Sequence, residues 1–163
     1  MYFYTYINSP LDTLLLVSNG DALVGLYMDT YRYDPQTNSD WKKSETEFKE
    51  VKKQLRAYFA RELQDFDLPI LMYGTEFQRK AWQALQKIPY GKTVSYLDQA
   101  KAIKSPKAVR AIGLANGKNP ISIIVPCHRV IGSNGKLTGY GGGIERKRWL
   151  LEHESPQAEM FAS

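Results

Sequence analysis

The sequence predicts an α+β fold in two parts. Apolar, β-branched segments joined by an Asn-Gly turn signal lie near the N-terminus, one long amphipathic segment follows them, and several short helical segments with start signals come later. These observations predict a small N-terminal domain with a three-stranded antiparallel sheet plus a helix, followed by a mostly helical, winged helix-turn-helix domain. Residues 65–73, with Pro69, read as the linker between the two groups, so we place the domains at residues 1–72 and 73–163.

Three strands are expected in the first domain. Residues 2–8 and 13–18 are rich in aromatic and β-branched residues and in leucine, which favour strands. Asn19-Gly20 then offers the two positive-φ positions of a tight hairpin, and a third strand is predicted over residues 22–28.

A polar loop at residues 31–40 leads to an amphipathic helix. Ser44 and Glu47 have the spacing of a capping box at the start of this helix. Apolar side chains then recur with helical periodicity, which predicts one buried face. The members of this stripe are Phe48, Val51, Leu55, Tyr58, Phe59 and Leu63.

The second domain begins with helices that carry their own start signals. Thr75 with Gln78 resembles a capping box, Ser95 is placed to cap a short helix, and Ser105-Pro106 is typical of a helix start. The last two helices are short and almost contiguous, as in a helix-turn-helix. An ordinary helical hairpin has the same spacing, so spacing alone does not decide between them.

The second helix of this pair combines small residues with basic ends. Small side chains allow a backbone to approach another helix or the wall of a DNA groove, and basic residues suit phosphates. The small residues are Ala108, Ala111, Gly113 and Ala115; the basic ones are Lys107, Arg110 and Lys118.

The remainder of the chain predicts one more strand, a turn and a closing helix. Residues 121–125 form an apolar run that reads as a strand, and Asn134-Gly135 is a second hairpin signal that would make the wing. A closing helix is expected over residues 145–154, with Trp149 and Leu150 buried.

Charge is distributed unevenly along the 163 residues. The chain has a net charge of +5 and a pI of about 9.2. Residues 1–72 carry 8 Lys/Arg and 11 Asp/Glu, a net charge of −3, whereas residues 73–163 carry 14 and 6, a net charge of +8. This asymmetry favours a polyanionic partner for the second domain, and a solvated basic surface is the equally weighted alternative.

Nothing in the composition indicates a membrane protein. No apolar run approaches the roughly 20 residues that cross a bilayer, and residues 1–6 lack the basic region of a signal peptide. A single cysteine fits a reducing compartment, so we expect a cytoplasmic protein.

The single cysteine, Cys127, lies between Pro126 and His128. It cannot form an internal disulfide, which leaves an inert packed thiol or a nucleophile. A nucleophile needs a base or cation to favour the thiolate, and His128 is the candidate. Adjacent side chains on an extended chain point to opposite faces, so either the backbone turns at Pro126-Cys127 or a water bridges thiol and imidazole. Glu152 or Glu154 would orient the imidazole.

The run Pro126-Cys127-His128-Arg129-Val130 resembles the signature of the O6-alkylguanine-DNA alkyltransferases, also called methylated-DNA–protein-cysteine methyltransferases. The resemblance is strongest from about Thr75 to Glu154, and over the N-terminal domain it is one of pattern rather than of motif. Further matching motifs are Ser95-Tyr96, Pro106-Lys107-Ala108-Val109-Arg110-Ala111, Asn119-Pro120, Tyr140-Gly141-Gly142 and Trp149-Leu150-Leu151-Glu152-His153-Glu154.

The resemblance implies a role for each residue of the reacting centre. Cys127 would accept the alkyl group, and His128 would act through a water as its base, oriented by Glu154. Asn119 would brace the turn around the thiol. Tyr96 would donate a proton to the flipped guanine as negative charge develops on the leaving base.

The resemblance also implies how DNA is held. Arg110 would fill the space left by the flipped base, while Ala108, Val109 and Ala111 would line the minor-groove face. Lys107 and Lys118 would contact phosphates. The substrate pocket would include Tyr140, the backbone N–H of Gly141 and Val130.

The implied function is DNA repair by irreversible, stoichiometric alkyl transfer from O6-alkylguanine to the protein's own cysteine after base flipping. O4-alkylthymine is a second candidate substrate. The product is a thioether that is not readily hydrolysed, so each molecule would react once. The expected partner is double-stranded DNA, bound through its minor groove by a monomer, with cooperativity left open.

No cofactor or metal is expected. Some family members carry a structural zinc in the N-terminal domain, but this chain has one cysteine and two histidines, all of them C-terminal. Two other classes remain open: a non-catalytic protein that binds alkylated DNA, and a Cys-His hydrolase of small amides. Binding-only relatives replace the acceptor cysteine by tryptophan, so the cysteine of this chain disfavours the first.

Overall fold

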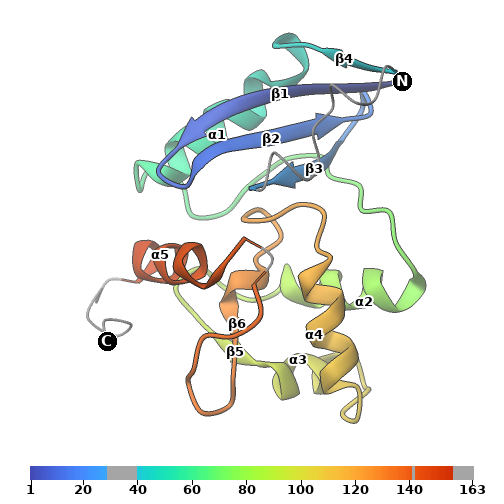
Figure 1. Ribbon diagram of the computed structural model, residues 1–163, viewed down its shortest axis with the longest axis vertical. Helices are drawn as coiled ribbons and strands as arrows, with labels where there is room; N and C mark the ends of the chain where they lie inside the picture. Colours follow the sequence, from blue (N-terminus) through green and yellow to red (C-terminus); the bar gives the residue numbers. More distant parts are fainter. Residues whose placement is uncertain (29–39, 141, 156–163) are drawn as a thin grey trace. The chain divides into compact units, whose positions relative to one another are not determined.

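The computed structural model describes residues 1–28, 40–140 and 142–155, and the chain divides into two units (Figure 1). The first unit comprises Met1–Tyr73 together with Pro120–Ser122. The second comprises Gly74–Asn119 and the chain from Ile123 onward. Most of the polar loop expected at residues 31–40 lies outside the described residues. Within the described ranges, no helix combines the length and apolar character needed to cross a membrane.

The sheet of the first unit has the strand order β3-β2-β1-β4. Strands β1 (Tyr2–Ser9), β2 (Asp12–Ser18) and β3 (Leu23–Tyr27) form the predicted antiparallel meander. A fourth strand, β4 (Trp41–Lys43), was not predicted and pairs in parallel with β1. Strand β4 could not be predicted because its three residues are too few to show an alternating pattern. Its pairing also depends on β1, which is far away in the sequence.

The turn between β2 and β3 is looser than the predicted two-residue hairpin. Only Gly20 has a positive φ, of 98°, whereas Asn19 does not. The side-chain oxygen of Asn19 instead accepts hydrogen bonds from the backbone N–H groups of Asp21 and Ala22, at 2.9 and 2.8 Å. The Asn side chain therefore shapes a four-residue loop, as is common for asparagine in turns.

Helix α1 (Lys49–Phe59) lies along the sheet and follows a short 3-10 turn, η2 (Thr46–Phe48) (Figure 1). The predicted capping box of Ser44 and Glu47 is wrong, because neither helical segment has a side-chain cap at its start. The backbone N–H of Ser44 instead donates to the carbonyl of Tyr4 and extends the pairing of β4 with β1.

The core of the first unit confirms four members of the predicted helical stripe, whereas Phe59 is only half-buried and Leu63 lies beyond the end of α1. Strand β2 is central in the sheet, and both of its faces are covered, which explains its continuous apolar run. The buried side chains from β2 and from the helical segments are Leu14, Leu15, Leu16, Val17, Phe48, Val51, Leu55 and Tyr58.

Three helices, α2 (Glu76–Leu85), α3 (Tyr96–Ala102) and α4 (Val109–Gly117), pack together in the second unit. The capping box at Thr75 is confirmed, and Ser95 caps α3 as predicted. Helix α4 begins three residues later than Pro106, because residues 105–108 form a turn in which the N–H of Ala108 donates to the carbonyl of Ser105.

This three-helix packing buries small and medium side chains together with one large ring. The small and medium residues are Ala81, Ala100, Ile112 and Ala115. Trp82 is buried beside them, and its indole N–H donates to the carbonyl of Ala115 at 2.9 Å. The indole thereby ties α2 to α4 with a satisfied buried donor.

The strand predicted over residues 121–125 is absent. Ile121 forms only an isolated bridge to Leu26, residues 122–124 form a turn, and Ile123 has a φ of +73°. A β-branched residue in the left-handed region is uncommon and strained. The apolar run is therefore a buried loop rather than a strand.

The segment around Asn134-Gly135, which was expected to form the wing as a hairpin, is a turn, and no antiparallel pairing is seen among its described residues. Strand β6 (Val130–Ile131) pairs in parallel with β5 (Val94–Ser95), and the chain then turns at Gly135, whose φ is +81°. The closing helix α5 (Ile144–Glu154) is present. Leu150 is buried as predicted, but Trp149 is only half-buried and stacks on the ring of His153.

Candidate active site

A sharp backbone turn places Cys127. Pro126 has φ −85° and ψ 66°, close to an inverse γ-turn, and the N–H of Cys127 donates to the carbonyl of Val125 at 2.9 Å. A 3-10 turn, η3 (Cys127–Arg129), follows immediately. Of the two arrangements considered for the sequence, the backbone therefore does turn at Pro126-Cys127. The thiol is buried, with 6% of the residue exposed.

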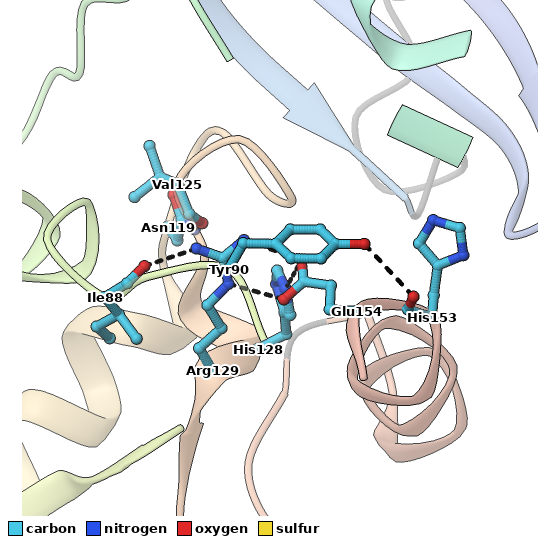
Figure 2. A network of polar contacts seen from close by, with 8 residues as sticks. All are labelled: Ile88, Tyr90, Asn119, Val125, His128, Arg129, His153 and Glu154. Atoms are coloured by element: carbon cyan, nitrogen blue, oxygen red, sulfur yellow. Dashed lines mark hydrogen bonds and ion pairs between the residues drawn. The ribbon is translucent and has the colours of Figure 1, made fainter. Parts of the chain in front are cut away.

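Asn119 braces this turn from the end of α4 (Figure 2). Its side-chain amide donates to the carbonyl of Val125 at 2.7 Å and to the sulfur of Cys127 at 3.2 Å. One side chain therefore holds both the loop that precedes the cysteine and the thiol itself. A donor aimed at sulfur favours the thiolate over the thiol.

One buried carboxylate, that of Glu154, bonds to both His128 and Arg129 (Figure 2). Nε2 of the wholly buried His128 lies 2.9 Å from Oε2 of Glu154. Arg129 donates to the same carboxylate from Nε at 2.8 Å and from Nη2 at 3.0 Å. A third nitrogen, Nη1, donates to the carbonyl of Ile88 at 2.7 Å.

Glu154, rather than Glu152, is thus the carboxylate that contacts His128. Burial alone would raise the pKa of Glu154, but the charges and hydrogen bonds of His128 and Arg129 outweigh it and hold this pKa well below the usual range. The other ring nitrogen of His128, Nδ1, is buried and has no hydrogen-bonding partner among the described residues.

The thiol does not have the lowered pKa expected of an activated cysteine. Burial raises the pKa of Cys127, and the hydrogen bond from Asn119 and the charge of Lys147 oppose this rise. The positive charge that acts on the thiol therefore comes from Lys147 on α5, which was not among the residues expected at the site, and not from His128.

An open hollow of about 410 Å³ lies beside α4. Tyr96 borders it, and its hydroxyl donates to the carbonyl of Thr138 at 2.9 Å. Arg110 lines the same hollow, together with the exposed side chain of Leu114. The remaining lining residues are Val109, Gly113, Thr138 and Gly139.

The other expected site residues are more scattered. Lys107, Ala111 and Lys118 are exposed on or beside α4, whereas Ala108 is half-buried at its N-terminus. Val130, expected in the substrate pocket, does not line the hollow, because it is wholly buried where β6 pairs with Val94.

Tyr140 is half-buried, and its carbonyl accepts the N–H of Gly143 at 3.0 Å. Gly141, whose N–H was expected in the pocket wall, lies outside the described residues. In the part of the chain that the structure describes, no three His, Cys, Asp or Glu side chains are placed to hold a metal ion.

Three functional candidates were missed in the sequence. Arg129 lies in the cysteine motif, but no pattern in the neighbouring sequence predicts its bond to Glu154, which is 25 residues further along the chain. Lys147 lies at helical spacing with three buried residues of α5, Leu150, Leu151 and Glu154, so the periodicity could have predicted its burial. Leu114 carried no signal beyond being apolar among small residues.

Comparison with known proteins places this geometry in a family. Residues 76–156 match the model of the 6-O-methylguanine DNA methyltransferase DNA-binding domain, and residues 2–72 match that of the ribonuclease-like domain of the same family. A methylated-DNA–protein-cysteine methyltransferase from Mycobacterium bovis is 51% identical over 97% of this chain and 95% of its own.

Solved structures agree with this match. An O6-methylguanine methyltransferase from Mycobacterium tuberculosis is 49% identical, covers 99% of both chains and superposes with a TM-score of 0.88. A structure described as OGT from the same organism in complex with DNA is 48% identical over 99% of both chains, with a TM-score of 0.87. The chain belongs to the 6-O-methylguanine DNA methyltransferase family.

Proposed function

We propose that this protein repairs DNA by moving an alkyl group from O6 of guanine to the sulfur of its own Cys127. The observation that carries the proposal is the environment of the chain's only cysteine. The thiol is held by the Asn119 amide, and the residue that follows it is bonded to a buried carboxylate, Glu154. Relatives named for transfer from methylated DNA to a protein cysteine, one of them solved with DNA, support the same reaction.

The reaction is a displacement at a saturated carbon. The Cys127 sulfur forms a bond to the alkyl carbon while the bond from that carbon to O6 breaks, and its electron pair passes to the guanine. Because Nε2 of His128 is engaged by Glu154, Nδ1 is the nitrogen left to take the thiol proton, directly or through a water. Tyr96 donates a proton to the guanine as charge develops on it.

The target atom is inaccessible in a stacked duplex, so the base must leave the helix, at a cost of a few kcal/mol. We place the extruded base in the hollow that Tyr96 and Arg110 border. Arg110 fills the gap in the stack. Ala108, Val109 and Ala111 face the minor groove, where small side chains permit close approach, and Lys107 and Lys118 bind phosphates. Tyr140 completes the pocket wall.

Each molecule acts once, as a monomer and without a cofactor. The thioether on Cys127 has no ionisable proton and is not readily hydrolysed, so the thiol is not regenerated. A single thiol that must stay reduced also favours the cytoplasm as the site of action. O4-alkylthymine presents a similar alkyl ether and is a second candidate substrate.

The test is intact-protein mass spectrometry after mixing with a duplex that contains one O6-methylguanine. The expected result is a mass increase of one methyl group, mapped to Cys127, with a plateau at one group per protein molecule under excess DNA. Cys127→Ser is the matched control: it should bind the duplex within a few-fold of the original affinity and gain no methyl group.

Each alternative function predicts a different experimental result. Tight binding of the lesion without any transfer would point to a binding-only protein. Sustained turnover on an ester or amide would point to a hydrolase. A methyl group found on a residue other than Cys127 would overturn the assignment of the acceptor.

A further inference from the structure

Two buried amide side chains join the helices that border the hollow. Gln99 lies in α3 with 2% of the residue exposed, and Asn116 lies in α4 with 5% exposed. Nε2 of Gln99 donates to Oδ1 of Asn116 at 3.0 Å, and Nδ2 of Asn116 donates to Oε1 of Gln99 at 2.8 Å. Nε2 of Gln99 also donates to the carbonyl of Ala81 in α2 at 3.1 Å. The amide pair therefore connects α2, α3 and α4.

Stability does not explain why both positions are polar. Apolar side chains of the same shape at the two positions would leave no buried amide unpaired, and such a double replacement is nearly neutral or stabilising. A reciprocal amide pair instead adds direction, because its two hydrogen bonds form together in one relative position of the helices and are lost when either helix slides or turns. Buried polar residues have this use between other helices, where they fix the register.

The apolar residues beside the pair define the register poorly. The buried cluster shared by the three helices consists of Ala81, Ala100, Ile112 and Ala115, so three of its four members are alanines. Side chains that end at Cβ form low ridges, and helices that meet through them can slide with little loss of contact. The amide pair therefore gives α3 and α4 a register that the alanines do not supply.

The reacting centre depends on this register at two points. Tyr96, the first residue of α3, and Arg110 of α4 line the same hollow, so a slide of one helix changes the distance between them. Near the end of α4, the carbonyl of Asn116 accepts the N–H of Asn119 at 3.2 Å. The Asn119 amide in turn donates to the sulfur of Cys127 at 3.2 Å. A continuous chain of contacts thus runs from the amide pair to the thiol.

We propose that the Gln99–Asn116 amide pair fixes α3 against α4 and thereby positions the groups that carry out the alkyl transfer. These groups are the Tyr96 hydroxyl, which delivers a proton to the guanine, and the Asn119 amide, which donates to the sulfur. Gln99 and Asn116 are positioning residues, because neither takes part in a bond that forms or breaks. The inference deepens the proposed function and rests on it for the transfer step.

Two double variants separate positioning from stability. The apolar variant, Gln99→Met with Asn116→Leu, keeps about the same side-chain volumes and removes both amides. The exchanged variant, Gln99→Asn with Asn116→Gln, keeps two amides and the summed length of the two side chains. The matched control is Gln83→Met, which replaces an exposed amide of α2. Thermal unfolding is measured for the wild type and for every variant.

Methyl transfer is measured as the first-order rate constant on saturating O6-methylguanine duplex, so that weaker DNA binding does not affect it. The apolar variant should unfold no more than about 2 °C below the wild type. Its transfer should nevertheless slow about 10-fold or more, because a small displacement of positioned groups can cost about 100-fold in rate. The exchanged variant should recover to within about three-fold of the wild type, and Gln83→Met should match it. A purely structural role predicts instead that the rate follows the unfolding temperature.

Alkylation of the thiol by iodoacetamide at pH 7.5 gives a second measurement that needs no DNA. Cys127 is the only cysteine, so mass spectrometry reports its reaction directly. The apolar variant should react several-fold more slowly than the wild type, because a displaced Asn119 no longer favours the thiolate. The exchanged variant should react at nearly the wild-type rate.

Three results would overturn the role of the amide pair. They are transfer by the apolar variant within about two-fold of the wild-type rate, an exchanged variant as slow as the apolar one, and a rate that falls only as the unfolding temperature falls. Failure of the proposed function looks different. In that case the wild type takes no methyl group from DNA, while its thiol still reacts faster than that of the apolar variant and the exchanged variant restores the difference.

Discussion

Replacing Glu154 by alanine tests the buried polar cluster that this carboxylate forms with His128 and Arg129. The carboxylate is almost fully buried and bonds to His128 and to two nitrogens of Arg129, at 2.8 to 3.0 Å. Its removal leaves the buried guanidinium of Arg129 with the Ile88 carbonyl as its hydrogen-bond acceptor among the described residues, beside the face of the Tyr90 ring at 5.7 Å. Breaking a buried pair in this way costs about 3–5 kcal/mol of unfolding free energy.

The same carboxylate should make stability depend on acid pH. The folded-state pKa of Glu154 lies below the ordinary value of 4.5, because its bonds favour the charged form despite burial. The stabilisation is therefore fully present above about pH 4.5, and it is lost as the pH falls from there toward the folded-state pKa. In Glu154→Gln this contribution is absent, so the stability difference from the wild type should shrink as the pH falls from 7 to 3.

The assay is urea unfolding followed by tryptophan fluorescence. In a Trp41→Phe background, the signal comes only from Trp82 and Trp149, both in the second unit. The matched comparison is Arg129→Met, alone and combined with Glu154→Ala. Because the two side chains interact directly, the double variant should lose less than the sum of the single losses, by about 0.5–3 kcal/mol. Additive losses, or a Glu154→Ala variant within 1 kcal/mol of the wild type, would refute the reasoning.

Three further outcomes are expected. Asn119→Ala removes the donor to the sulfur and should raise the thiol pKa further, so that iodoacetamide alkylation at pH 7.5 slows several-fold; an equal or faster rate would contradict the role of the amide. Trp82→Phe loses the indole hydrogen bond to the Ala115 carbonyl and should cost about 1–2 kcal/mol in urea unfolding, whereas an unchanged midpoint would show that the bond contributes nothing. Arg110→Ala should slow repair of duplex DNA far more than of single strands, where there is no stack to fill; equal slowing on both, with a salt slope reduced by about one, would make Arg110 a phosphate contact.

Local patterns were sufficient for much of the fold. The strands of the antiparallel meander, the buried stripe of α1 and the capping boxes at Thr75 and Ser95 are each encoded within a few consecutive residues. Where the pattern was ambiguous, the prediction failed. The apolar run at residues 121–125 reads as a strand, but among the described residues it pairs only through the single bridge from Ile121 to Leu26. Ser44 has the spacing of a helix cap, but its backbone N–H instead donates to the carbonyl of Tyr4 and extends the pairing of β4 with β1.

The sequence by itself determined the chemistry at Cys127, because the Pro-Cys-His-Arg motif and the basic charge of residues 73–163 are properties of composition and order. The tertiary structure alone decided how that chemistry is controlled. Which carboxylate meets His128, the burial that raises the thiol pKa and the approach of Lys147 from α5 all depend on segments distant in the chain. Desolvation and Coulomb energies are sums over every neighbouring group, so they become defined only when packing has fixed those neighbours.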